Sequence, residues 1–227
     1  MSLTEPRSAS ELRFYLTRAG VGAGASYAEA EFLAQAAERL AAEGVDPSGP
    51  SVRALENLAA EHEAGTPVRH ESALKVCAAV CDQINLAWGR SQAGQLDAGS
   101  VDEPLLLVSA VAAQCAEVPL VELSFHAPGA TLVVSVIAGS INPDAFAQLE
   151  DLDARQHDSS WQVAIKVLAQ NNQQMGRQPD WRGLFSKGIR METNAWSRIQ
   201  SLFHKSLVPS NDQSRLAGAG AGLNDND

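Results

Sequence analysis

The sequence predicts an α+β protein with a helical N-terminal part, followed by a small, mainly antiparallel sheet packed by helices. Three observations predict this class. Apolar residues recur at helical spacing through the first 90 residues, a two-residue alternation follows between 121 and 136, and a second alternation runs from Trp161 to Val167.

Length and composition are those of a folded globular protein. The 227 residues include 45% hydrophobic side chains, which is too many for a disordered chain. Lys and Arg number 17 against 27 Asp and Glu, so the formal net charge is −10. Because phosphate backbones are bound by concentrated positive charge, we expect no nucleic-acid partner. The longest apolar runs, at 105–113 and 131–138, fall short of the ~18 residues of a membrane span, so no membrane association is expected.

The N-terminus and the cysteines both bear on the cellular compartment. Residues 1–10 are polar and lack the apolar region of a signal peptide. Three cysteines, an odd number, do not make a disulfide framework. These features predict a cytoplasmic protein.

Four helices are expected in the first 90 residues. Two begin at capping-box spacings, Ser8 with Glu11 and Ser26 with Glu29, and a third begins at Gly49-Pro50. The fourth carries Cys77 and Cys81 on its apolar face. The expected helix ends are glycines: Gly20, Gly44, Gly65 and Gly89. Alanine fills many apolar positions of these helices, so they can approach one another closely.

Residues 90–102 are polar, contain two glycines and predict a linker. The linker divides the chain into a helical subdomain, 1–90, and an α+β subdomain, 103–227, that ends in a glycine-rich tail. The two parts could also form one continuous domain. After the linker, 105–115 predicts a buried helix, with a strand over 105–108 as the alternative.

The expected sheet begins with a hairpin. Residues 121–126 and 132–136 alternate on either side of Pro128-Gly129, which predicts two strands with a four-residue connection. Asn142-Pro143 then predicts the start of a helix, 161–167 a third strand, and the amide-rich stretch 169–180 a loop. Trp196, Ile199 and Phe203 mark a last helix that Pro209 ends.

Most reactive side chains have a structural interpretation. Cys77, Cys81 and Cys115 lie on apolar faces and are expected in the core, and no metal site is predicted. The histidines are far apart in sequence; His62 is expected to be solvated, and His126 lies beside the hairpin turn. The acidic cluster is expected at a solvated helix end and consists of Glu150, Asp151, Asp153 and Asp158. Gly20 to Gly24 resembles a loose G-x-G pattern but follows a helix, so it predicts a helix–helix connection.

The C-terminal segment holds the candidate ligand-binding residues. Arg215 could clamp a carboxylate or phosphate, with Ser214 and glycine amides as donors, while Asp225 and Asp227 could hold a cation. The full candidate set is Ser214, Arg215, Gly218, Gly220, Gly222, Asp225 and Asp227. No phosphate loop is expected at this segment, because too few residues follow Gly222 to form its helix.

Two stretches resemble an uncharacterised bacterial family, a domain of unknown function that spans nearly the whole chain. They are the Gly-Val-Gly-Ala-Gly run at 20–24 with its following helix, and the C-terminal Val-Pro, Ser-Arg, Gly-Ala-Gly-Ala-Gly and Asn-Asp-Asn-Asp pattern within 208–227. The resemblance implies no activity, but it favours an ordered or functional tail. Residues 12–65 are also similar to the helical start of the type-2 malate/L-lactate dehydrogenase family, whose Gly-Val-Asp-Ser-His-Gly run is here interrupted by Pro47 and lacks the histidine.

The sequence leaves two functions open and names no cofactor or reaction. The first is a non-catalytic binding or accessory protein. The second is a small-molecule-binding enzyme whose site is built from the C-terminal Ser-Arg and glycine-rich segment. Open sheet edges and thinly filled helix faces predict a homodimer in either case.

Overall fold

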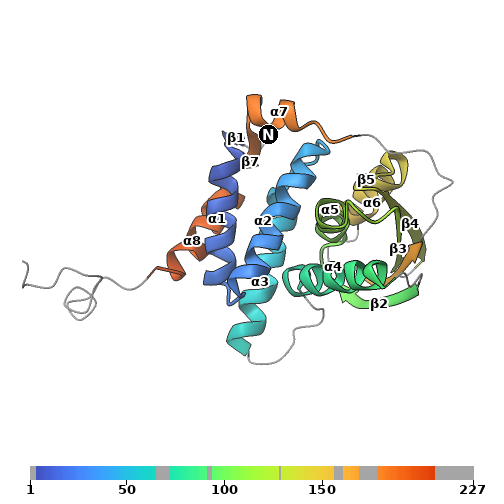
Figure 1. Ribbon diagram of the computed structural model, residues 1–227. Coiled ribbons are helices and arrows are strands. Elements are labelled where there is room, and N and C mark those ends of the chain that lie inside the picture. Colours follow the sequence, from blue (N-terminus) through green and yellow to red (C-terminus); the bar gives the residue numbers. More distant parts are fainter. Residues whose placement is uncertain are drawn as a thin grey trace, which may run out of the picture.

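The computed structural model describes residues 4–64, 72–90, 94–127, 129–155, 161–168 and 178–207, which contain eight helices and seven strands. The helices are α1 (Ala9–Gly22), α2 (Tyr27–Ala42), α3 (Ser48–Ala64), α4 (Ala73–Gly89), α5 (Pro104–Gln114), α6 (Pro143–Arg155), α7 (Trp181–Lys187) and α8 (Thr193–Lys205). The strands are β1 (Thr4–Arg7), β2 (Gly94–Val101), β3 (Leu120–Ala127), β4 (Ala130–Ile137), β5 (Ser140–Ile141), β6 (Trp161–Leu168) and β7 (Ile189–Glu192). The predicted α+β class is confirmed (Figure 1).

The larger sheet is antiparallel throughout and has the strand order β2-β6-β3-β4-β5. The predicted hairpin is β3–β4, but its strands pair as far as Ala127 and Ala130, so the connection is shorter than the four residues expected. Strand β6 follows α6 in the chain and lies between β2 and β3. β1 and β7, from opposite ends of the chain, form a separate two-stranded sheet.

The predicted starts of the first two helices are confirmed. The Ser8 side chain accepts from the Glu11 amide, and Ser26 and Glu29 form a complete capping box. Gly44, at φ 93°, follows the end of α2, as expected for a residue in the left-handed region. α1, however, continues to Gly22, past its predicted end at Gly20.

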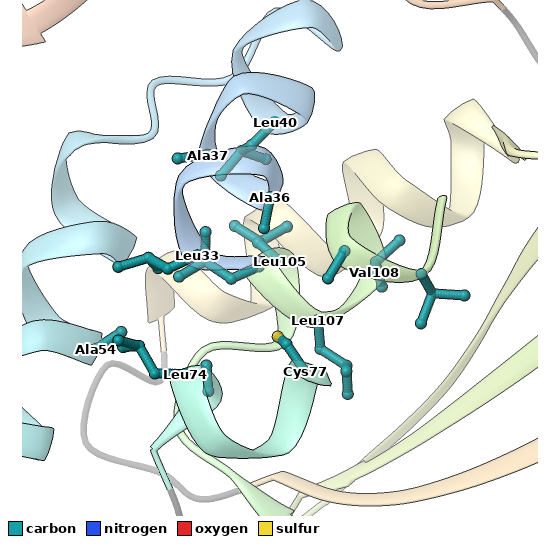
Figure 2. Close-up of a cluster of buried hydrophobic side chains, with 14 of the residues drawn as sticks. Leu33, Ala36, Ala37, Leu40, Ala54, Leu74, Cys77, Leu105, Leu107 and Val108 are labelled. Atoms are coloured by element: carbon teal, nitrogen blue, oxygen red, sulfur yellow. The ribbon is translucent and has the colours of Figure 1, made fainter. Parts of the chain in front are cut away.

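Helix α5 lies between the helical part and the sheet, and it contacts α2 on one side and β4 and β5 on the other (Figure 1). Residues 104–112 of α5 are all buried, which confirms the predicted helix over the strand alternative. Figure 2 shows Leu105, Leu107 and Val108 among side chains from α2 and α4. A helix with neighbours on every side has no polar face, and this is why its sequence lacks amphipathic periodicity.

All three cysteines are buried and free, and Cys77 lies in the cluster of Figure 2. Burial raises the pKa of the Cys77 thiol, and the Cys115 thiol together with burial raises that of Cys81. Protonated thiols are poor nucleophiles and poor metal ligands. The prediction that these residues are core side chains is confirmed.

The predicted linker at 90–102 is wrong over most of its length, because Gly94–Val101 forms the edge strand β2. The register shifts between Asp97 and Gly99, and Gly99 has φ 71°, so the two glycines and the irregular alternation mark a bulged edge strand. The strands β1 and β7 and the short helix α7 were also not predicted. Short elements of this kind carry too few residues for a periodic signal.

Gly22 is required where α1 packs against α8. A Cβ atom at this position would overlap the backbone carbonyl of Leu202, which cannot move aside as a side chain would. We expect Gly22→Ala to destabilise the protein by roughly 1–3 kcal/mol, measured by urea unfolding. Gly89→Ala is the matched control, because a Cβ there meets nothing within 4 Å and the change should be near neutral. Equal stability of the two variants would contradict this packing.

Candidate functional site

A groove of about 340 Å³ lies between α2, the end of α5, the β4–β5 turn and the start of α7. We call it the interlayer groove, because its lining residues come from both the helical part and the sheet part. Its volume falls in the range of roughly 300–1,000 Å³ that is typical of small-molecule sites. Its lining is Arg13, Gln35, Glu38, Arg39, Ala112, Ala113, Gln114, Ala116, Ala138, Gly139, Gln178, Pro179 and Trp181.

Two guanidinium–carboxylate pairs hold one side of the groove. Arg39 is buried, and it donates to the Gly139 carbonyl at 2.7 Å and to Glu43 at 2.9 Å. Arg13, from α1, makes a two-point contact with the buried Glu38 of α2. Arg39 therefore ties α2 to the β4–β5 turn, and the positive charges on this wall are matched by carboxylates.

Side-chain amides line the rest of the groove. Gln35 of α2 and Gln114 of α5 hydrogen-bond to each other, and Gln178 donates to the Ser140 hydroxyl at 2.9 Å. Trp181 adds an aromatic edge, and the alanines at the end of α5 add a small apolar floor. Amides both donate and accept hydrogen bonds, so this lining suits a neutral ligand that carries several polar groups.

The β4–β5 turn at the groove has an unfavourable residue. Ala138 and Gly139 have φ values of 46° and 76°, the pattern of a type I′ hairpin turn, in which asparagine is preferred at the first position. We expect Ala138→Asn to raise the free energy of unfolding by about 0.5–1 kcal/mol in a thermal melt, because asparagine tolerates the left-handed region better than alanine. An unchanged or lowered melting temperature would argue against this turn.

A larger hollow of about 590 Å³ lies at the C-terminal end of α2, beside β7 and α7. Its carboxylates already have structural partners. Asp46 accepts from the amide and hydroxyl of Ser48, and Asp180 caps α7 by accepting from the Gly183 amide at 2.8 Å. We favour the interlayer groove as the ligand site, because it brings together three side-chain amides, and an amide that makes one hydrogen bond still has donor and acceptor positions for a ligand.

The second notable cluster is buried and joins four parts of the fold. Arg53 of α3 makes a two-point contact with Glu103, at 2.5 and 2.7 Å, and lies 3.3 Å from Asp153 of α6. Asp102, next to Glu103, accepts from Asn57 at 2.8 Å and from the Ala73 amide at the start of α4, at 2.7 Å. We call this set the Arg53 cluster.

The Arg53 cluster holds three buried carboxylates around one guanidinium. Burial raises the pKa of Glu103 to about 8, even though Arg53 opposes the shift. Burial also raises the pKa of Asp102, against the hydrogen bond from Asn57. For Arg53, burial lowers the pKa but the hydrogen bond and charge of Glu103 outweigh it, so its pKa is raised. Burial therefore decides the direction of the shift at Glu103 but not at Arg53, because Arg53 keeps 30% of its side chain exposed whereas Glu103 keeps only 2%.

The predicted acidic helix end is wrong for one residue. Asp153 is buried and faces Arg53, whereas Glu150 and Asp151 are exposed as expected, and Asp158 lies outside the described residues. Helix α6 turns one face to the core, and Asp153 lies on it with Phe146 and Leu149. Sequence reasoning also missed Arg53 and Glu103. The available signal was the pair of acids directly before the largely apolar helix α5.

The C-terminal candidates Ser214, Arg215, Gly218, Gly220, Gly222, Asp225 and Asp227 lie outside the described residues and stay a prediction, which a truncation after Leu216 tests. His62 is exposed, as predicted, and His126 is exposed beside the hairpin turn with Nδ1 3.2 Å from the Thr131 hydroxyl. The helix–helix connection predicted at Gly20–Gly24 is wrong in its first part, because α1 continues to Gly22 and the connection to α2 begins only at Ala23. Within the described ranges, no group of three or more His, Cys, Asp and Glu could hold a metal ion.

A scan against protein-family models found no match. Comparisons with curated proteins and with solved structures found none either. The resemblances drawn from the sequence therefore stay predictions. None of the helices in the described part of the chain is both long and apolar enough to span a membrane.

Proposed function

We propose that this chain is a non-catalytic binding protein whose ligand occupies the interlayer groove. The observation that carries the proposal is the convergence of Gln35, Gln114 and Gln178 on one groove, together with charge-paired arginines. Side-chain amides hold and orient a ligand by hydrogen bonds, but they exchange no proton near neutral pH. This lining supports binding of a neutral, polar small molecule.

A thermal-shift panel tests the proposal. The compounds are neutral sugars, nucleosides and small amides, with carboxylates, nucleotides and divalent chlorides as the comparison set. A compound that binds the native state and not the unfolded chain raises the melting temperature, and the rise grows with the ratio of its concentration to its Kd. We expect the largest shifts from the neutral compounds.

A pair of neighbouring variants shows whether the groove is responsible. Ala116 lines the groove and is exposed, so Ala116→Trp should fill it and remove the ligand-induced shift. Glu117 is exposed and is not part of the lining, so Glu117→Trp should keep the shift. A shift that survives in Ala116→Trp, or a panel with no active neutral compound, would overturn the proposed function.

We also propose that the binding protein is a homodimer that pairs through β2. β2 is an outermost strand of its sheet, and its far edge has no partner strand among the described residues. Such edges are normally covered or paired. Light scattering should give the mass of a dimer; a monomer at tens of micromolar would contradict the dimer without affecting the groove.

Three buried free thiols support a cytoplasmic location for this binding protein, because a reducing compartment keeps such thiols unpaired. Expression of a tagged chain with cell fractionation tests the location.

A further inference from the structure

A second groove, of about 500 Å³, lies between the end of α3, one face of α4 and the edge strand β2. It shares no lining residue with the interlayer groove. Glu61 of α3, only 6% exposed, lines it, and its Oε2 pairs with the Lys75 ammonium of α4 at 2.8 Å. The other oxygen, Oε1, is buried and has no hydrogen-bond partner in the part of the chain that is described.

An unpartnered carboxylate oxygen is unusual in a protein interior. Buried charged acceptors nearly always receive hydrogen bonds, because desolvation without a partner is costly. The Lys75 side chain in front of Glu61 is 50% exposed, so it can swing into solvent and open the carboxylate. Glu61 Oε1 is therefore an acceptor that a ligand with N–H donors would satisfy.

The charges of the groove favour a cationic ligand. Asp97 of β2 lines it, is exposed and accepts only from the nearby Gly99 amide among the contacts described. With Glu61, Asp97 and Lys75, the groove carries two negative charges against one positive charge. Val76 and Val80 of α4 form an apolar wall beside these groups.

We propose that this groove binds a small organic cation, a primary ammonium on a short aliphatic stem. The ammonium donates to Glu61 Oε1 and is attracted by Asp97, while the stem lies against Val76 and Val80. A primary ammonium has three N–H donors, so it can serve both carboxylates at once. The interlayer groove has no part in this site, and the two proposals stand or fall separately.

Isothermal titration with n-butylammonium chloride tests the site, and sodium butyrate and tetramethylammonium chloride serve as matched probes. Butyrate has the same stem with the opposite charge, and tetramethylammonium has the charge without N–H donors. We expect saturable binding of butylammonium in the millimolar range or tighter, and at least about tenfold weaker binding of both matched probes. Equal binding of tetramethylammonium, or no saturable binding of butylammonium, would overturn the proposal.

Three variants separate the site from a general effect of surface charge. Glu61→Gln should weaken butylammonium binding about tenfold or more, whereas Glu63→Gln, at an exposed carboxylate two residues away, should leave it unchanged. Lys75→Gln should tighten binding, because it removes the cation that competes for Glu61. If Glu61 has only a structural role, Lys75→Gln should not bind butylammonium more tightly than the native sequence does. Unchanged affinity in Lys75→Gln would therefore contradict the proposed site, even if Glu61→Gln folds poorly.

Discussion

Replacing Arg53 by methionine is expected to destabilise the protein by roughly 3–5 kcal/mol at pH 9, where Glu103 is ionised in the native state, because this is the usual cost of removing one partner from a buried ion pair. Arg53 supplies the positive charge for Glu103 and Asp153, both of which are buried. Without Arg53, the buried and ionised carboxylates still bear the free-energy cost of desolvation, but no positive charge offsets it. We expect the lower end of the range, because Arg53 itself is 30% exposed.

Urea unfolding measures this effect, and Arg198→Met is its control. Arg198 pairs with Glu56 across α8 and α3, but both side chains are more than 40% exposed, so we expect a change of about 1 kcal/mol or less. The stability lost in Arg53→Met should also shrink as the pH falls below 8, because Glu103 then takes up a proton and no longer needs a cation. A deficit below that of Arg198→Met would mean that the Arg53 cluster does not hold the fold together.

The second large effect is a loss of stability as the pH rises from 5 to 9. Glu103 has an ordinary pKa of 4.5 when unfolded and a pKa of about 8 when folded. A raised folded pKa means that the native state binds the proton more tightly. The stabilisation is therefore full below pH 4.5 and is lost as the pH rises through 8. The difference between the two pKa values corresponds to an effect of about 5 kcal/mol on the free energy of unfolding.

Glu103→Gln isolates this contribution, because glutamine keeps an oxygen for Arg53 and cannot titrate. We measure the free energy of unfolding of both proteins by denaturant between pH 5 and 9. It should fall with rising pH for the native sequence and fall less steeply for the variant. Asp102, whose pKa is also raised, leaves some residual slope in the variant. Parallel curves would show that Glu103 remains ionised throughout and that the Arg53 cluster holds no proton at neutral pH.

Much of the fold could be predicted because its long elements bury one face. The alternation of Val121, Leu123 and Phe125 on β3 is the signal of a half-buried strand, and these residues are buried in the structure. The capping residues Ser8 and Ser26 act through contacts only three residues away. Such local rules hold regardless of what lies on the other side of the element.

The elements that were missed depend on partners far along the chain. β1 forms only because β7, more than 180 residues later, lies beside it. The sequence of β2 is polar and contains glycine, so it predicts a linker. An edge strand tolerates such a sequence, because it needs few β-branched residues and can hold a bulge at Gly99. Pairing partners of this kind are set by tertiary packing, which one sequence does not reveal.

The candidate sites could not be predicted from the sequence for the same reason. Gln35, Gln114 and Gln178 belong to three separate segments, and nothing in their local sequences predicts that they share a groove. Arg53 lies beside a buried stripe of α3, and a charged residue there is ordinarily assigned to solvent. Its role depends on Glu103, fifty residues later in the chain.

The most direct test of the binding function follows the side-chain amide resonances of Gln35, Gln114 and Gln178 by NMR. The titrant is the neutral compound that gives the largest thermal shift. Binding in the interlayer groove predicts saturable shifts of these amide signals with one shared affinity, while Gln83, in the second groove, stays unchanged. Unmoved signals from all three glutamines at a saturating concentration would contradict the function proposed here.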